Sequence, residues 1–116
     1  MKQYDHPQAA EFQVLPILHA LADPFRLSIV RKLAQVQPQP CGPLQAGRPK
    51  SSVSHHFAVL RKAGVLRTDV VGVTHMNSLR TQELEARFPG LLGAILAALA
   101  QEEERAPELN SCPVEA

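Results

Sequence analysis

The stretch SSVSHHFAVLRKAG, residues 51–64, decides which fold the chain can adopt. At about 100° per residue, Val53, Phe57 and Leu60 fall on one side of a helix, which predicts a buried face there. We expect this helix over about residues 50–63, with its end at Gly64. The opposite side carries small polar and cationic residues, namely Ser51, Ser54, His55, Arg61 and Lys62. Such a face suits a helix in the major groove of DNA, because short polar side chains reach base edges while Lys and Arg neutralise phosphates.

The adjacent histidines His55 and His56 invite two other interpretations. Neighbouring residues of a helix point roughly 100° apart, so the pair cannot grip one metal ion as histidines at i and i+4 would. Ser51 lies one helical turn from His55, a spacing that would allow a serine nucleophile with a histidine base. However, no acidic residue nearby in sequence would orient that base. The pattern therefore favours His55 at the DNA. His56, on the edge of the apolar face, is expected to pack against the preceding long helix or to bond a backbone carbonyl.

The segments before this helix predict two more helices and a turn. VLPILHALA places Val14, Leu18 and Leu21 at helical spacing. Asp23-Pro24 ends that helix and begins the next, with Asp23 as its N-cap. FRLSIVRKLA then has an apolar face of Phe25, Ile29 and Leu33, and an outer face with Arg26, Arg31 and Lys32. The Pro- and Gly-rich residues 37–49 allow only a single helical turn, around 43–46.

The segments after it predict a hairpin and two helices. VLRTDVVGVTHMNSL forms two short strands, about 65–70 and 73–79, turned at Val71-Gly72. A short helix near 81–87 and a longer one after Pro89 follow. The predicted fold is therefore mainly α with a small β-hairpin. In this winged helix-turn-helix, a three-helix core is followed by the hairpin as the wing and by a C-terminal dimerisation helix.

The net charge of +1 conceals an uneven distribution. From Pro24 through Thr68 there is no Asp or Glu, and this interval holds eight of the twelve Lys and Arg residues. The chain after Asp69 is mainly acidic. A basic half of this kind is typical of a surface that binds a polyanion.

The length of 116 residues corresponds to one domain. We expect a flexible arm at residues 1–11, the folded domain at residues 12–105 and a disordered tail at residues 106–116. No apolar run is long enough to cross a membrane, and the polar start does not resemble a signal peptide. The sequence therefore predicts a cytoplasmic protein with no membrane partner.

Two stretches, ALADPFRLSIVRKLA at 20–34 and SSVSHHFAVLRKAGVLRTDVVGVTHMNSL at 51–79, resemble the ArsR/SmtB-type winged-helix repressors. The resemblance covers roughly residues 12–100. It implies a homodimer, not an enzyme, that binds a partly palindromic operator in double-stranded DNA and releases it on sensing an inducer. The residues expected at the DNA are Arg48, Lys50, Ser51, Ser54, His55, Arg61 and Lys62, with Arg67, Thr74 and His75 on the wing.

The resemblance also implies a dimer built from the first and last helices, with Leu15 and Leu18 on the first. The last helix carries an apolar stripe, Leu92, Ile95, Leu96 and Leu99, which has no obvious partner in so small a domain. The stripe therefore favours a dimer seam, and packing within the chain is the alternative.

The sensor is where the sequence departs from the family. Metal-sensing members often carry a cysteine pair in the third helix, and others place ligands on the last helix. Here only Cys41 lies in that region and no histidine follows His75, so we expect no metal site and no cofactor, and the inducer stays unidentified. Two alternatives remain open. One is a thiol-based redox or metalloid-responsive repressor that uses Cys41 and Cys112, and the other is a winged-helix module that binds a partner protein.

Overall fold

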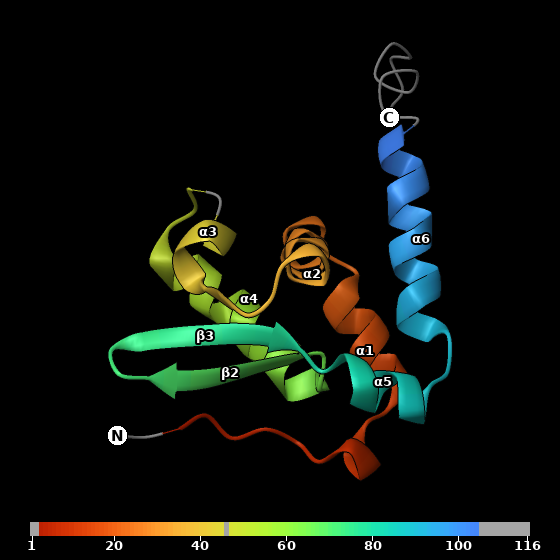
Figure 1. The fold of residues 1–116 in the computed structure, drawn as a ribbon, viewed down its shortest axis with the longest axis horizontal. Helices are drawn as coiled ribbons and strands as arrows, with labels where there is room; N and C mark the ends of the chain where they lie inside the picture. Colours follow the sequence, from red (N-terminus) through yellow and green to blue (C-terminus); the bar gives the residue numbers. More distant parts are fainter. Residues whose placement is uncertain (1–2, 46, 105–116) are drawn as a thin grey trace.

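The computed structural model describes residues 3–45 and 47–104. Six helices and a small sheet follow one another along the described chain (Figure 1): a 3-10 turn η1 (Ala9–Glu11), α1 (Val14–Leu21), α2 (Pro24–Gln35), β1 (Gln39–Pro40), α3 (Cys41–Gln45), α4 (Lys50–Ala63), β2 (Leu66–Val71), β3 (Thr74–Leu79), α5 (Thr81–Arg87) and α6 (Leu91–Glu104). The prediction of a mainly helical chain with a winged helix-turn-helix order is confirmed.

Local sequence fixes the ends of the two central helices. The Asp23 side chain accepts a hydrogen bond from the Arg26 amide at 3.0 Å, and Pro24 occupies the first turn of α2. A cap of this kind contributes about 1 kcal/mol. Gly64 ends α4 with φ 93°, a left-handed conformation that glycine adopts without strain. Its missing side chain also matters, because a Cβ there would overlap the ring of Phe12.

One apolar cluster joins α1, α2, α4 and the start of the wing. The predicted face of α2, Phe25, Ile29 and Leu33, is buried, as are the three apolar residues of α4: Val53, Phe57 and Leu60. On α1 the buried residues are Ile17, Ala20 and Leu21, whereas Val14 and Leu18 are exposed, so the predicted α1 stripe is shifted. α4 is thus anchored along one side, which leaves its other side for solvent or a ligand.

β2 and β3 form an antiparallel hairpin, with pairs running from Leu66 opposite Leu79 to Val71 opposite Thr74. β1 adds to the other edge of β3, so the strand order is β1-β3-β2. The sequence did not predict β1, because two residues, one of them proline, carry no strand pattern.

The N-terminal segment, predicted to be a loose arm, first runs beside the outer edge of β2, and its 3-10 turn η1 then lies against α5 (Figure 1). The Gln3 side chain accepts from the Val70 amide at 3.0 Å and donates to the Val70 carbonyl at 3.2 Å. The Thr68 amide donates to His6 Nε2 at 3.0 Å, and Arg80 donates to the Pro7 carbonyl at 2.6 Å. Side-chain groups that bond a strand edge follow no periodic pattern, so hydrophobic spacing could not reveal this docking.

The predicted dimer residues separate into two groups. On α1, Leu15 is 75% exposed and Leu18 is 43% exposed. On α6, Leu92 is only 8% exposed and belongs to the core cluster, so its side chain packs within the chain rather than at a free surface. Ile95 and Leu96 are partly buried against the same cluster.

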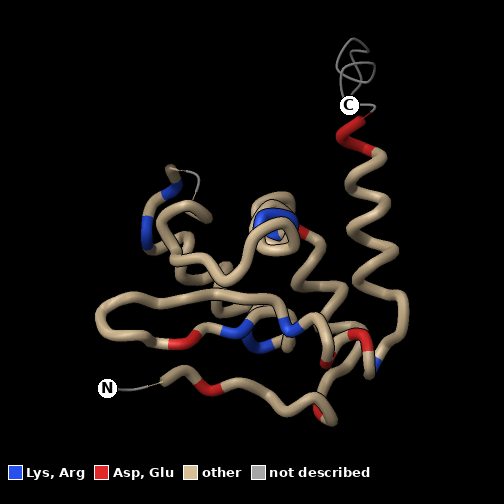
Figure 2. Tube along the Cα trace, in the orientation of Figure 1, with Lys and Arg blue, Asp and Glu red and all other residues tan. Residues whose placement is uncertain are grey.

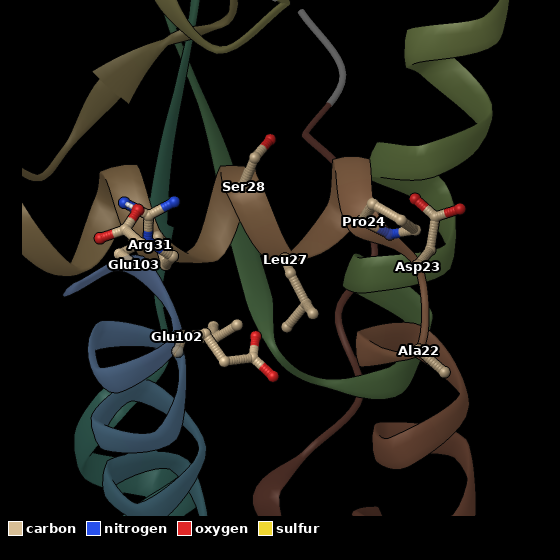
Figure 3. A pocket seen from close by; sticks show the side chains of 9 residues that line it. Ala22, Asp23, Pro24, Leu27, Ser28, Arg31, Glu102 and Glu103 are labelled. Carbon is tan, nitrogen blue, oxygen red and sulfur yellow. Dashed lines mark ion pairs between the residues drawn. The ribbon is translucent and has the colours of Figure 1, made fainter. Parts of the chain in front are cut away.

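The end of α6 approaches α2. Arg31 of α2 forms an ion pair with Glu103, and between the two helices lies a cavity of about 470 Å³ (Figure 3). Leu27 and Leu99 are the larger apolar residues of its lining. Leu99 therefore faces a space beside α2 in the single chain. The predicted tail from residue 106 onward lies outside the described residues.

Candidate nucleic-acid interface

The outward side of α4 is the candidate reading surface. Lys50, Ser51, Ser54, His55 and Lys62 are all exposed, while the opposite side of the helix is buried in the core. The N-cap position is Pro49, and no side chain of the described part of the chain caps this end. The first N–H groups of α4 are thus available to a phosphate, which the helix dipole also favours.

His56 is turned away from this surface, as the sequence predicted. Its ring lies 5.0 Å from that of Phe25, and Nδ1 lies 3.1 Å from Arg26 Nη1. Since guanidinium can only donate, Nδ1 accepts and the imidazole is neutral. Burial lowers the pKa of His56, Asp23 opposes this, and Arg26 is among the nearby groups that add to it.

Arg26, which the sequence placed on an outer face, is buried at the junction of three helices. Besides His56 of α4, it donates to the carbonyl oxygens of Ala20 at 2.6 Å and His19 at 3.3 Å, at the end of α1. These bonds satisfy carbonyls that a helix end leaves free. Arg26 therefore fixes α4 relative to α1 and α2. The helical pattern could not predict this role, because it placed Arg26 on the outer face of α2.

All three of the predicted DNA-contacting arginines have partners within the chain, two of them on α4 or just before it. The Arg61 guanidinium lies 4.0 Å from the centre of the Tyr4 ring and donates to Thr68 Oγ1 at 3.3 Å. The Arg48 guanidinium lies 4.3 Å from the centre of the Phe25 ring. Arg61 thus faces the arm and the wing, while Arg48 lies over α2 at the start of α4.

The wing carries the remaining predicted contacts. Arg67 and His75 are exposed, and Thr74 is half-buried. Arg67 Nε pairs with Asp69 Oδ1 at 3.1 Å, and His75 Nδ1 is 2.9 Å from the hydroxyl of Tyr4. Tyr4 is a residue that the sequence did not predict at this surface. Its only signal was that it is the single tyrosine in an otherwise polar arm.

Charge is distributed as the sequence predicted. Lys and Arg lie over α2, the segment that leads into α4 and the start of the wing (Figure 2). Asp and Glu lie mainly on the arm, α5 and the end of α6. The basic residues thus accompany the exposed face of α4, where a polyanion would bind.

The candidate sensor residues can be followed only in part. Cys41 begins α3, is half-buried and accepts a hydrogen bond from Asn77 Nδ2 at 3.4 Å. Cys112 lies outside the described residues. Over residues 3–45 and 47–104, no group of three or more His, Cys, Asp or Glu side chains is arranged to hold a metal ion. Within the same ranges, no helix has the length and apolar character needed to span a bilayer.

Comparison with known proteins identifies the class of the chain. A family model described as a helix-turn-helix domain matches residues 21–69. YceK of Bacillus subtilis strain 168, an uncharacterized HTH-type transcriptional regulator, is 34% identical over 95 residues, which are 79% of this chain and 90% of that protein.

Solved structures share the fold. The homodimeric winged helix-turn-helix DNA-binding domain of Mb0332 from Mycobacterium bovis, a possible ArsR-family regulator, matches with a TM-score of 0.61 at 20% identity, over 80% of this chain and 82% of that one. The transcriptional repressor BigR from Xylella fastidiosa matches with a TM-score of 0.53 at 24% identity, over 65% and 85%. These proteins are regulators or DNA-binding domains rather than enzymes, in agreement with the sequence prediction. The chain therefore belongs to the HTH-type transcriptional regulators, and its helix-turn-helix DNA-binding domain has the winged fold found in the ArsR family.

Proposed function

We propose that the protein is a homodimeric repressor that binds a partly palindromic operator and leaves it when an inducer binds. The observation that carries this proposal is the exposed polar face of α4, opposite the buried Val53, Phe57 and Leu60. Ser51, Ser54 and His55 read base edges in the major groove, since hydroxyl and imidazole groups can both donate and accept hydrogen bonds. Lys50 and Lys62 neutralise phosphates on either side.

The wing contributes contacts beside the groove. Arg67, Thr74 and His75 reach the adjacent backbone or the minor groove, and Arg48 reaches the backbone at the start of α4. Arg61 contributes mainly through the wing, because its guanidinium is already engaged by Tyr4 and Thr68. The folded domain spans residues 12–105 and acts in the cytoplasm.

The dimer forms through α1 and α6. Leu15 and Leu18 support this proposal, because both are large apolar side chains exposed to solvent, and burying them at an interface is favourable. The Mycobacterium bovis domain of the same fold is homodimeric. Of the α6 residues, Ile95, Leu96 and Leu99 are the better candidates for the interface, since Leu92 packs within the chain. A dimer places two α4 helices on successive half-sites, about one turn of duplex apart.

Thiol sensing remains an alternative mode of release. The half-buried Cys41 would act with Cys112, through a disulfide or a bound metalloid. A module for a partner protein is less favoured, because an interface usually has aromatic anchors and the exposed side of α4 has none.

The test of DNA reading uses duplexes selected from a random pool. In a gel shift at fixed salt, the double substitution Ser54→Ala with His55→Ala should weaken specific binding by at least roughly 30-fold, since each base contact contributes about 1–3 kcal/mol. Both side chains are exposed, so the fold and the dimer should persist. Unchanged specific affinity would refute the proposal.

Lys62→Ala is the matched variant, because it removes a phosphate contact from the same helix. It should weaken binding to selected and random duplexes alike, and reduce the salt dependence of log K by about one unit. A loss confined to the selected sequence would mean that Lys62 reads bases.

A further inference from the structure

A cavity of about 180 Å³ lies where α3, α4, the wing and the arm meet. Its apolar walls are Val53 and Phe57, both buried residues of α4. Its polar walls include Lys50, Ser54 and Arg61 of α4, together with Tyr4 of the arm. No Asp or Glu is among the lining residues. The lining thus combines cationic and apolar residues without a carboxylate.

Arg61 is the unusual member of this lining. It is half-buried, and none of the ion pairs among residues 3–45 and 47–104 includes it. Of its five N–H donors, one bonds Thr68 Oγ1 at 3.3 Å. Burial lowers the pKa of Arg61, with no carboxylate among the groups that counter the effect. The Tyr4 ring, 4.0 Å from the guanidinium, offsets part of the cost of desolvating this cation, and an anion bound to the in-plane N–H groups would offset more.

The volume and the lining of the cavity indicate which kind of anion would fit. A water molecule occupies about 30 Å³ of liquid, so there is room for a molecule the size of a single ring. Val53 and Phe57, each only 3% exposed, present a small apolar surface to the cavity, which an apolar body would contact more favourably than a bare phosphate or sulfate. A planar carboxylate also matches the two parallel donors of a guanidinium.

We propose that this cavity binds a small carboxylate with an apolar body, held by Arg61 and Lys50 against Val53 and Phe57, and that this ligand weakens operator binding. The second part rests on the proposed function. Lys50, Ser54 and His75 line the cavity and are also expected at the DNA. A carboxylate among them brings negative charge towards the phosphates and uses donors that would otherwise bind DNA.

Binding is tested first on the full chain without DNA, with benzoate as the probe. Titration followed by calorimetry and by the midpoint of thermal unfolding should show saturable binding and a rise in that midpoint. Benzamide has the same shape without the charge and should bind at least roughly tenfold more weakly, the loss expected for one charge-assisted hydrogen bond pair. Acetate, which lacks the ring, should also bind more weakly. Equal effects of benzoate and benzamide, or no effect of benzoate, would overturn the proposal.

The site is assigned with two neighbouring cations of α4. Arg61→Gln should weaken benzoate binding at least roughly tenfold, whereas Lys62→Gln, which removes the same charge at an exposed position outside the cavity, should not. Circular dichroism checks that Arg61→Gln is folded. Lys50→Gln is a second variant at an exposed position and should weaken binding as well. An equal loss in Arg61→Gln and Lys62→Gln would show only a general charge effect and would exclude this cavity.

Coupling is tested separately, with sodium benzoate replacing sodium chloride so that ionic strength stays constant. Benzoate should lower the operator affinity of the unmodified chain by several-fold, and should leave that of Arg61→Gln unchanged relative to its own value without benzoate. Benzoate that binds without changing operator affinity would refute the regulatory part alone. A chain that binds benzoate but no duplex would instead refute the proposed function.

Discussion

His6 and His56 are both held as neutral imidazoles. The Thr68 amide donates to Nε2 of His6, and Arg26 donates to Nδ1 of His56. Burial is the largest cause that lowers the pKa of each below 6.5, and Arg67 and Arg80 add to it at His6 while Asp69 opposes them. Protonation of either ring removes the acceptor of its hydrogen bond. Acid should therefore loosen both the arm and the junction of α4 with α2.

The pH dependence of stability follows from these two shifts. A histidine with a folded pKa below its unfolded value binds protons more readily when unfolded, so the free energy of unfolding is constant above about pH 6.5 and falls as the pH decreases through the lower folded values. The lowered pKa values of Asp23 and Glu83 start from 3.8 and 4.5, so they act in more acidic solution. Urea unfolding at about pH 7.5 and about pH 5.5 measures the difference. His6→Gln should reduce the dependence, and equal stability at the two pH values would contradict the assignment.

The sequence could predict which side chains of α4 are exposed, but not which residues of other segments they contact. The helical period alone separates His55 from His56, because both neighbours lie on one regular element. The partner of Arg61 is Tyr4, and that of His56 is Arg26, each on another segment of the chain. Such pairs depend on how segments pack, which the spacing within one helix does not encode.

The end of α4 and the turn of the wing allow a test on the elements themselves. Gly64 has φ 93° and Gly72 has φ 63°, so alanine is strained at both. A Cβ at Gly72 has no atom within 4 Å, whereas one at Gly64 would overlap the Phe12 ring. Gly72→Ala should lower the free energy of unfolding by about 1 kcal/mol, and Gly64→Ala by about 3 kcal/mol, in urea titrations. Equal losses would mean that the Phe12 ring moves aside freely.

The elements with strong local signals were predictable. Asp23-Pro24 marks the start of α2 and Gly64 the end of α4, because caps and turns are written in a few adjacent residues. The hairpin agreed within about one residue at each end. β1 escaped prediction, since its strand character comes from pairing with Met76 and Asn77 of β3 and not from its own residues.

The assembly of the whole molecule is tested by placing a charge on α1. Leu15→Glu should weaken the proposed dimer at least roughly tenfold, because an unpaired carboxylate would be buried at the contact. Val36→Glu is the matched control, since Val36 is similarly exposed, at 63%, but follows α2. Sedimentation equilibrium of the two variants measures the difference, and circular dichroism confirms that each is folded. Identical association of the two variants would exclude Leu15 from the interface.

At this scale the sequence predicted the layout but not every contact. The sequence favoured a dimer seam for the apolar stripe on α6, but Leu92 packs inside the chain, which was the alternative. The docking of the arm was also missed, because a polar segment with one proline resembles an unstructured end. Both contacts join segments that are far apart in the sequence, so the pattern within one segment does not reveal them.

The docked arm also determines how the protein behaves when concentrated. β2 is an outer strand, and a bare strand edge can recruit a strand from another molecule without limit. The side chains of Gln3 and His6 form hydrogen bonds with the outward-facing backbone groups of Val70 and Thr68, so these groups are not available to another strand. A chain without its first eight residues should therefore form open-ended aggregates, whereas the full chain should associate no further than the proposed dimer.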